Sequence, residues 1–553
     1  MTTHLEPAPL PEEKAVQPSD TRGWVMQLFS ALEAASGENG SQSRVAAMIG
    51  AFLSERTVSS SIDFCSLVDR FAASQLPDGC ASETDYLDYL AENVVPHSIR
   101  TSSPLCIGNM TSALPHFTGP LATLLLAMNQ NLVKVEASKA LSLLERQALA
   151  MMHRLVYQRA DEFYLDSSRR LGRTLGIFAS GGTVANATAL WCARNASLGP
   201  CGSFRGVADE GMEAALRYYR CGGAVIIGSA LMHYSMEKAA DLLGIGARSL
   251  IKVPVDQQCR VSLPALQDAL STCRNRNQHV IALVGVAGST DSGSVDPLSE
   301  MADIASRNRC HFHVDAAWGG PLLFSEQHRY KLSGIERADS VTIDGHKQMY
   351  LPTGLGMVLF RSERTPEFVR RHASYALRPD SADLGKDTLE GSRGGTGLFL
   401  HAALHIIGRK GYEILIDESM CKARYMADAI GERPEFELLR EPESNIILYR
   451  YIPAQFRGSN RAVHDRSETE LINNFNTRLQ KTQRRAGRTF VSRTTIGLGT
   501  RDGAPITALR AVISNPLITR ADIDGILSDQ QTLAAQLERD EAGVCDSLHN
   551  GPE

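Results

Sequence analysis

The sequence predicts an α/β protein built around a mostly parallel sheet. Between residues 175 and 360, short apolar runs rich in Val and Ile alternate with helical stretches, and runs that are apolar on both faces are typical of a parallel sheet covered by helices. At 553 residues, the chain is also too long for one core. The predicted strands are Leu175–Phe178, Ala224–Gly228, Ser249–Val255, Val280–Val286, Phe312–Ala317, Ser340–Ile343 and Gly356–Phe360.

The flanking sequence predicts a different organisation on each side of this sheet. We expect a flexible arm over residues 1–21, a helical segment over 22–130, a large domain over 131–399 and a small α+β domain over 400–553. The apolar spacing predicts one amphipathic helix over Lys134–Tyr157. In the last region we expect a long helix, three strands and a closing helix from Asp522. Those strands are Asn445–Ile452, Arg488–Ile496 and Ile506–Ser514.

Composition excludes several classes of protein. Hydrophobic residues make up 43% and charged residues 22%, which is ordinary globular usage. A net charge of −5 without a basic patch argues against nucleic acid as a partner, and the longest apolar runs are too short to cross a membrane. The eleven cysteines lack paired spacing, and the N-terminus lacks the pattern of a secretory signal. We therefore expect a cytoplasmic protein with reduced thiols and no metal site.

Residues at the ends of the predicted strands carry the chemistry, because ligands of parallel sheets bind beyond the carboxyl ends of strands. After the first strand come Gly182 and Thr183, at the start of a predicted helix. Glycines let the backbone approach a phosphate, Thr183 can cap the helix, and free N–H groups attract an anion. The alternative is that the glycines serve only the geometry of the turn.

The segment HFHVDAAWGG, residues 311–320, admits three interpretations. His311, His313 and Asp315 share one face of a strand and could bind a metal. Asp315 could instead be a buried carboxylate held by hydrogen bonds, or it could face a cofactor. Small residues such as Ala317 follow Asp315 and leave room for a flat ring. Because no further metal-ligand pattern lies nearby, we favour the cofactor.

Two further strand ends contribute a lysine and a histidine. Lys347 follows the strand Ser340–Ile343, next to His346. Most lysines are solvated surface residues, but a lysine between two apolar runs is suited to covalent chemistry with an aldehyde. His233 follows the strand Ala224–Gly228; a lone histidine is usually structural, but here it could stack on a ring.

The ordered series SGGTVAN, LMHYS, AGST, HVDAAWGG and DGHK is similar to that of the group II pyridoxal-phosphate (PLP) dependent decarboxylases. This family includes the glutamate, cysteine-sulfinate and aromatic amino-acid decarboxylases. The segments RHASY and ALRAVISNP extend the likeness. Within the family, CIGNMTSALP and TIDGHKQMYLPTG most resemble the branch of bacterial aspartate 1-decarboxylases.

The resemblance implies a fold-type I enzyme whose active site is completed across a homodimer interface. It implies decarboxylation of a small acidic L-amino acid, with L-aspartate first and glutamate or cysteine sulfinate as alternatives. The alternative from a different functional class is a paralogue that has this fold but no catalytic activity. The discrimination between these substrates by chain length is worth only about 1–3 kcal/mol per methylene.

The resemblance also implies residue roles. Lys347 would bind PLP as a Schiff base, Asp315 would pair with the pyridine nitrogen, and His233 would stack over the ring. The other implied contacts are Ala317 beneath the ring, Thr290 near its substituents, Gly182, Thr183 and His346 at the phosphate, and Arg510, Thr111 and Ser112 at the substrate.

Three departures from the family pattern concern the site. Asp344 and Gly345 replace the usual Asn-Pro, and Asn109 stands where the aspartate branch has histidine. The segment Ala376–Leu389 corresponds to a loop that carries a catalytic tyrosine in relatives. This chain has Ala382 there and no tyrosine in the segment, so we expect another proton donor, His233 or Lys347. Its polar composition predicts an exposed, mobile loop.

Overall fold

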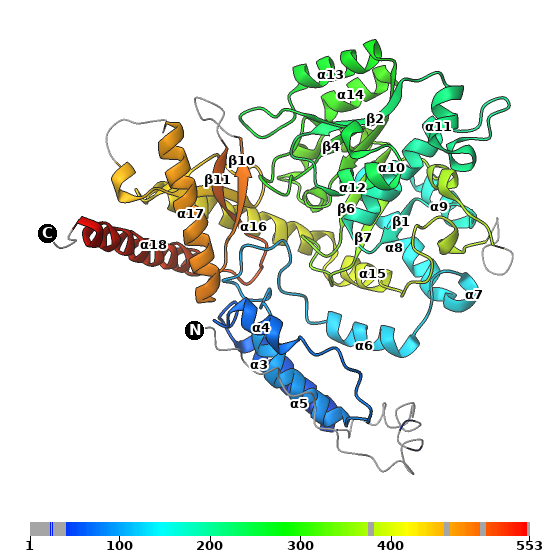
Figure 1. The fold of residues 1–553 in the computed structure, drawn as a ribbon. Helices are drawn as coiled ribbons and strands as arrows, with labels where there is room; N and C mark the ends of the chain where they lie inside the picture. Colours follow the sequence, from blue (N-terminus) through cyan, green and yellow to red (C-terminus); the bar gives the residue numbers. More distant parts are fainter. Residues whose placement is uncertain are drawn as a thin grey trace. The chain divides into compact units, whose positions relative to one another are not determined.

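The computed structural model describes residues 23, 25, 40–373, 381–457, 465–497 and 505–549. The arm predicted over residues 1–21 lies outside these described residues. Two sheets and the helices around them make up the fold (Figure 1). Among the described residues, no helix combines the length and apolar character that crossing a membrane requires.

The larger sheet has seven strands in the order β1-β7-β6-β5-β4-β2-β3. Neighbouring strands are parallel except at β7, which runs antiparallel to both β1 and β6. The predicted mostly parallel sheet is therefore confirmed. The strands are β1 (Gly176–Ala179), β2 (Gly223–Ser229), β3 (Leu250–Val253), β4 (Gln278–Val286), β5 (His311–Asp315), β6 (Ser340–Asp344) and β7 (Gly356–Phe360).

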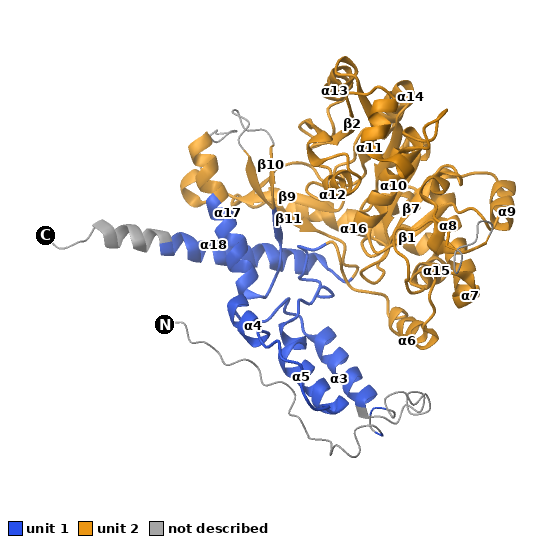
Figure 2. Ribbon diagram, turned by 45° about the vertical axis from the view of Figure 1, so that its right-hand side comes forward, with its two compact units in different colours: residues 1–109, 474–493, 517–553 blue, residues 110–473, 494–516 orange. Residues whose placement is uncertain are grey.

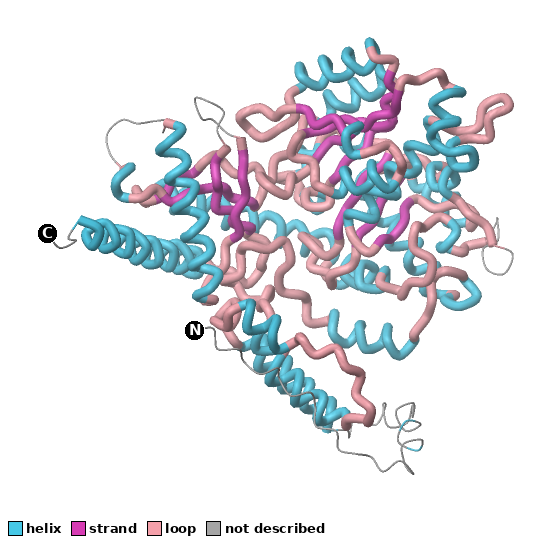
Figure 3. The backbone as a smooth tube through the Cα atoms, viewed as in Figure 1, coloured by secondary structure: helices cyan, strands magenta, loops and turns pink. Residues whose placement is uncertain are grey.

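Helices cover both faces of this sheet, as Figure 3 shows. Successive side chains of a strand point to opposite faces of the sheet, so β4 contributes to two hydrophobic cores. Leu283 packs in one core, and Ala282 and Val284 pack in the other. The first core takes in side chains of α8 (Ala140–Tyr157), α13 (Leu263–Asn275), α14 (Leu298–Asn308) and α15 (Gly397–Ile406). The second takes in α10 (Gly182–Ser197) and α12 (Ser235–Leu242). Strands buried on both faces explain the continuous apolar runs of the sequence.

The single helix predicted over Lys134–Tyr157 is wrong. The structure has a short helix α7 (Val135–Ser138) and then α8, because Lys139 adopts a φ of +33° between them. A non-glycine residue with positive φ interrupts the α-helical hydrogen-bond ladder. The remaining helices of the large sheet's surroundings are α6 (Thr118–Met128), α9 (Asp161–Arg169) and α11 (Val207–Tyr218).

The smaller sheet has four strands in the order β10-β11-β9-β8. Strand β9 (Ile446–Tyr451) lies antiparallel between β8 (Phe436–Leu438) and β11 (Ile506–Val512), and β10 (Ser492–Ile496) forms the far edge. The sequence did not predict the three-residue strand β8. The helices in this part of the sequence are α16 (Gly408–Gly431), α17 (Arg466–Ala486) and α18 (Arg520–His549).

The chain divides into two compact units (Figure 2). Unit 1 comprises Met1–Asn109, Asn474–Arg493 and Leu517–Glu553, and unit 2 comprises Met110–Asn473 and Thr494–Pro516. Within unit 1, the Ile107 N–H donates to the Phe490 carbonyl at 2.9 Å, and Arg56 forms an ion pair with Asp522. These contacts join segments far apart in sequence. The helices near its start are α3 (Gly40–Ser54), α4 (Phe64–Arg70) and α5 (Glu83–Asn93).

A buried histidine of α8 makes the stability of the fold depend on pH. His153 is 0% exposed; its Nε2 donates to the Phe360 carbonyl at 3.0 Å, and its Nδ1 accepts from the Tyr164 hydroxyl at 3.0 Å. Burial lowers the pKa of His153 to about 4. Below its ordinary pKa of 6.5 the unfolded chain therefore binds a proton that the folded chain does not, and stability is lost as pH falls from 6.5 towards 4.

We expect His153→Gln, whose side chain does not titrate, to flatten this dependence. Between pH 7.5 and pH 4 the wild type should lose about 3 kcal/mol more unfolding free energy than the variant. Urea unfolding of both proteins at the two pH values measures the difference. Parallel losses in the two proteins would show that His153 titrates normally in the fold.

Candidate active site

The carboxyl ends of six strands lie at one edge of the larger sheet. All strands except β7 run in the same direction. The sequence motifs with chemical character each follow one of these strands. This edge is where ligands of parallel sheets bind.

A cavity of about 380 Å³ lies at this edge. It is lined by every residue that the sequence assigned to a cofactor: Gly182, Thr183, His233, Thr290, Asp315, Ala317, His346 and Lys347. Residues separated by 165 positions in the sequence are thus brought to one site. Asn186, Tyr234, Trp318, Asp344 and Thr353 also line it, and sequence reasoning did not assign them.

Helix α10 begins at the cavity, and no side chain caps its first N–H groups. Its N-cap is Gly181, with φ 144° and ψ 175°. The expectation that Thr183 caps this helix is therefore wrong, because Thr183 lies inside the first turn. The first N–H groups of a helix have no intrahelical acceptor, and they form a positive end that suits a phosphate.

Asp315 accepts hydrogen bonds from two neutral donors. The Asn186 amide donates to Oδ2 at 2.9 Å, and the Ala317 N–H donates to Oδ1 at 3.1 Å. Asp315 is 6% exposed, and neither of these two donors carries a charge. These donors stabilise the carboxylate without neutralising its charge, so that charge stays directed at the cavity.

Asn186 connects Asp315 to a buried chain of polar groups. The Asn186 Oδ1 accepts from His313 Nε2 at 3.0 Å, and His313 Nδ1 accepts from the Ser340 hydroxyl at 2.9 Å. The hydroxyl oxygen in turn accepts from His311 Nε2 at 2.7 Å. Burial lowers the pKa of His313 to about 4, so this ring is neutral at neutral pH. His311 and His313, which could have bound a metal by one interpretation of the sequence, instead form hydrogen bonds in the chain that positions Asn186 and Asp315. Asn186 was missed because an asparagine in a helical run gives no sequence signal of a buried partner.

Lys347 contacts a carboxylate at the end of β6. Its Nζ lies 2.9 Å from Asp344 Oδ2, and the side chains of Lys347 and Asp344 are 16% and 2% exposed. His346 Nδ1 donates to the Leu355 carbonyl at 2.8 Å, which leaves Nε2 3.8 Å from Asp344 Oδ2. The lysine amine therefore faces the cavity beside a buried negative charge.

His233 lies across the cavity on the loop between β2 and α12. Its Nδ1 accepts from the Ser235 N–H at 3.3 Å, and its ring contacts Tyr234 with centroids 4.1 Å apart. Burial lowers the pKa of His233, so the ring is neutral at neutral pH. A neutral flat ring held by the backbone can stack on a planar ligand.

The three residues predicted to bind substrate are not among the residues that line this cavity. Arg510 Nε donates to the Thr290 carbonyl at 2.6 Å, and burial lowers the pKa of Arg510 to about 10, so it is charged at neutral pH. Thr111 and Ser112 are half-buried and follow Met110, which packs against Trp318 of the lining.

The expectation of an exposed loop over Ala376–Leu389 is wrong for its described part. Residues 374–380 lie outside the described residues. From residue 381 onward, Asp383 and Asp387 are 4% and 3% exposed. Asp383 accepts from the Val135 N–H at 2.8 Å, and Arg370 forms an ion pair with Asp387. Polar residues that are paired in this way can be buried, which composition alone does not reveal.

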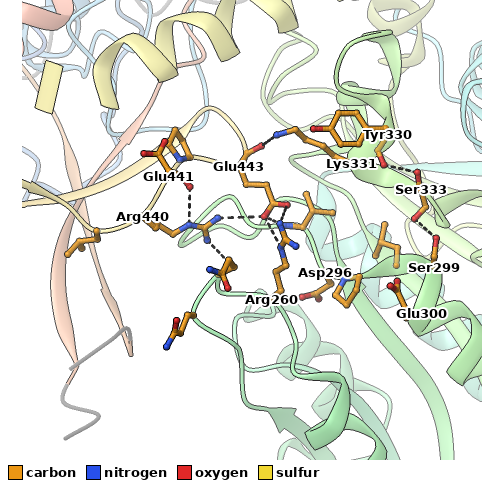
Figure 4. A pocket seen from close by; sticks show the side chains of 17 residues that line it. Arg260, Asp296, Ser299, Glu300, Tyr330, Lys331, Ser333, Arg440, Glu441 and Glu443 are labelled. Carbon is orange, nitrogen blue, oxygen red and sulfur yellow. Dashed lines mark hydrogen bonds and ion pairs between the residues drawn. The ribbon is translucent and has the colours of Figure 1, made fainter. Parts of the chain in front are cut away.

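A second, larger cavity of about 1050 Å³ also lies in unit 2 (Figure 4). Its cations are already paired. Arg260 donates two hydrogen bonds to the Glu443 carboxylate, and Lys331 donates to the Glu443 carbonyl at 2.6 Å. Arg440 donates to the Gln258 carbonyl at 2.7 Å and forms an ion pair with Glu443. None of the residues that the sequence assigned to the cofactor or the substrate, all of which the structure describes, lines this cavity. This cavity is therefore an ion-paired cleft rather than the candidate active site.

The fold and the smaller cavity define an α/β enzyme centred on a lysine and an aspartate. Residues 72–452 match the family model "Pyridoxal-dependent decarboxylase conserved domain". The chain is 42% identical over 518 residues to aspartate 1-decarboxylase of Aliivibrio fischeri, covering 93% of this chain and 95% of that protein. It is 27% identical to the cysteine sulfinic acid decarboxylase of Mus musculus, covering 80% of this chain and 85% of that one.

The fold is likewise similar to the crystal structure of Oryza sativa TDC with PLP and tryptamine. The TM-score is 0.75 at 18% identity, with 95% of this chain and 99% of that chain covered. The chain belongs to the pyridoxal-dependent decarboxylase family, and it is a PLP-dependent amino-acid decarboxylase. The family resemblance drawn from the motifs is confirmed.

Proposed function

We propose that this enzyme decarboxylates L-aspartate to β-alanine and CO₂. The observation that carries the proposal is the similarity to an aspartate 1-decarboxylase, which extends at 42% identity through 93% of the chain. Glutamate and cysteine sulfinate are the alternative substrates, since both are small acidic amino acids.

The residues of the smaller cavity fit a pyridoxal phosphate group. The uncapped start of α10 offers N–H groups to a phosphate, with Thr183 and His346 beside it. Small Ala317 leaves space for a ring, and Asp315 keeps a charged carboxylate for the ring nitrogen. Lys347 supplies the amine for covalent attachment.

When bound, pyridoxal phosphate links to the substrate amine and accepts the electron pair that remains at Cα when CO₂ leaves. We propose that Asp315 holds a proton on the ring nitrogen, which Asn186 favours by fixing the carboxylate. His233 would cover the ring and exclude water from one face. Arg510, with Thr111 and Ser112, would bind a substrate carboxylate.

We expect Arg510→Lys to reduce kcat/KM for dicarboxylic substrates by about 10- to 100-fold, because a lysine cannot form two parallel hydrogen bonds to a carboxylate. Arg450→Lys is the matched control: Arg450 is a buried arginine of the neighbouring strand β9, paired with Glu437. Steady-state kinetics of both variants measure the effect. Equal kinetics in Arg510→Lys and wild type would make Arg510 a structural residue of the sheet.

A product assay with aspartate, glutamate and cysteine sulfinate side by side tests the substrate. We expect kcat/KM to be highest for aspartate, with β-alanine and CO₂ formed in equal amounts. Preference for either alternative would replace aspartate, and release of CO₂ from none of the three would overturn the acidic-substrate proposal.

We also propose that the chain acts as a cytoplasmic homodimer with the active site at the subunit interface. Ten cysteines of the described residues are free thiols, which suits a reducing compartment. Helix α6 leaves Leu124 and Leu126 exposed at 49% and 78%, and such apolar surface suits a subunit contact. Residues 131–399 would form the cofactor-binding domain of each subunit, and 400–553 the small domain.

A further inference from the structure

A closed ring of three hydrogen bonds joins the residue after Lys347 to two other parts of the chain. The Gln348 amide donates to the Trp318 carbonyl at 2.8 Å, and the Trp318 indole N–H donates to Asn445 Oδ1 at 3.1 Å. The Asn445 amide completes the ring by donating to Gln348 Oε1 at 3.1 Å. Each of these side chains belongs to a residue that is 1% exposed. A buried amide without a partner is costly, so each member depends on the other two.

The chemistry of the groups fixes the direction of this ring. An indole N–H can only donate, and a backbone carbonyl can only accept. The Asn445 oxygen therefore faces the indole and its NH2 group faces Gln348, whose own NH2 group faces the Trp318 carbonyl. The Asn445 NH2 group also donates to the Ile513 carbonyl at 3.1 Å. If either amide were reversed, like groups would meet, so the ring has a single arrangement.

The ring connects the smaller cavity to the smaller sheet. Gln348 directly follows Lys347, Trp318 follows β5, and Asn445 directly precedes β9. Trp318 itself lines the cavity, where a Cβ atom on Gly288 would lie 2.9 Å from the indole Cδ1. Neither Gln348 nor Asn445 is among the residues that line it. The ring therefore acts on the cavity indirectly, through the turn of Lys347 and through the indole.

The turn of Lys347 has a backbone conformation that needs support. Tyr350 is 3% exposed and adopts a φ of +57°, in the left-handed region that a bulky residue seldom occupies. Its N–H donates to the Lys347 carbonyl at 3.1 Å, and the Met349 carbonyl accepts from the Tyr412 hydroxyl at 3.0 Å. Such strain persists only where the surroundings hold it, and it gathers at functional sites. Gln348, between these two carbonyls in sequence, ties the same turn to the hydrogen-bonded ring.

We propose that Gln348 and Asn445 are positioning residues that act as one unit to fix the backbone of Lys347 for its reaction. This inference rests on the proposed role of Lys347. A lysine side chain is long and flexible, so the place of its amine depends on where its backbone is held. A misplacement of about 1 Å near the reacting groups can cost on the order of 100-fold in rate. Through Asn445, the smaller sheet thus supports the lysine without lining the cavity.

The experiment compares Gln348→Met, Asn445→Leu and the double variant with wild type. Both substitutions keep the approximate volume of the side chain and remove its amide. Gln483→Met is the matched control, because Gln483 is a buried amide of α17 that pairs with Thr489 and Gln530. Thermal unfolding verifies that each variant folds. Since Asn445 has a further backbone partner, Gln348→Met decides the outcome if Asn445→Leu does not fold.

The first measurement is amide hydrogen exchange of the full-length chain freed of cofactor, followed by mass spectrometry. We expect exchange in the turn, residues 345–351, to be about tenfold faster or more in both single variants and in the double variant. Exchange in β3, at the far edge of the larger sheet, should stay as in wild type. Gln483→Met should leave the turn unchanged. A turn that exchanges at the wild-type rate in Gln348→Met would overturn the proposal.

The second measurement is steady-state turnover of the cofactor-loaded variants on the preferred substrate. We expect each single variant to lose about tenfold or more in kcat with KM changed by less than about twofold, since neither side chain lines the cavity. The double variant should lose about as much as the weaker single variant, because one break already opens the ring. Gln483→Met should keep the wild-type kcat.

Two outcomes of the kinetics would contradict the proposal. Losses in kcat that multiply in the double variant would show that Gln348 and Asn445 act independently. An unchanged kcat in variants whose turn exchanges faster would show that the reaction does not depend on the ring.

Failure of the proposed role of Lys347 gives a different result. Attachment of the cofactor to another lysine in wild type would remove that role, and the positioning proposal with it, even if the turn loosens in the variants. Attachment at Lys347 together with an unchanged turn in both single variants would remove only the role of Gln348 and Asn445.

Discussion

Lys347→Ala is expected to abolish turnover and covalent attachment of the cofactor. Lys347 is the lysine that lines the smaller cavity, three residues after the end of β6. An alanine offers no amine for the proposed attachment. We expect activity to fall to background, with cofactor binding weakened rather than lost because the phosphate contacts remain.

The matched control is Lys331→Ala, which removes a partly buried lysine from the other cavity. Activity assays and visible absorbance after cofactor addition compare the two variants. Lys331→Ala should retain near-wild-type absorbance and turnover. Wild-type amounts of covalent cofactor in Lys347→Ala would mean that another lysine carries it.

Asp315→Asn is expected to slow decarboxylation on the order of 10³-fold while preserving the fold. The amide has the shape of the carboxylate, so the contacts with Asn186 and Ala317 can largely be kept. It lacks the negative charge that would keep a proton on the ring nitrogen of the cofactor, and the bound cofactor would then be a weaker electron acceptor.

Cofactor affinity, thermal unfolding and kcat of Asp315→Asn should be measured together. We expect weaker cofactor binding, an unfolding temperature close to wild type and a large loss in kcat. Turnover near the wild-type rate would return Asp315 to a purely structural role on β5.

The sequence predicted the larger sheet well because strands that are buried on both faces appear in the sequence as continuous apolar runs. Each of its seven strands was expected at its place, and Lys347 and Asp315 follow from the rule that ligands bind at strand ends. Local patterns were less informative where one backbone angle decides the structure. The break at Lys139 between α7 and α8 is such a case, since the apolar spacing continues across it.

Polar partnerships between distant segments were beyond sequence reasoning. Asn186 and Asp315 are 129 positions apart, and their hydrogen bond exists only because α10 and β5 pack together. The burial of Asp387 by Arg370 likewise overturned an expectation drawn from composition. Asp344 departs from the family pattern in the sequence, but only the fold reveals its contact with Lys347.

Mapping the attachment site of the cofactor tests the central claim most directly. The cofactor-loaded wild-type enzyme is reduced with borohydride, digested, and its modified peptide is sequenced by mass spectrometry. We predict one modified residue, Lys347, in the peptide that contains Asp344 and His346. Stoichiometric modification of any other lysine, with Lys347 unmodified, would contradict the assignment of this cavity as the active site.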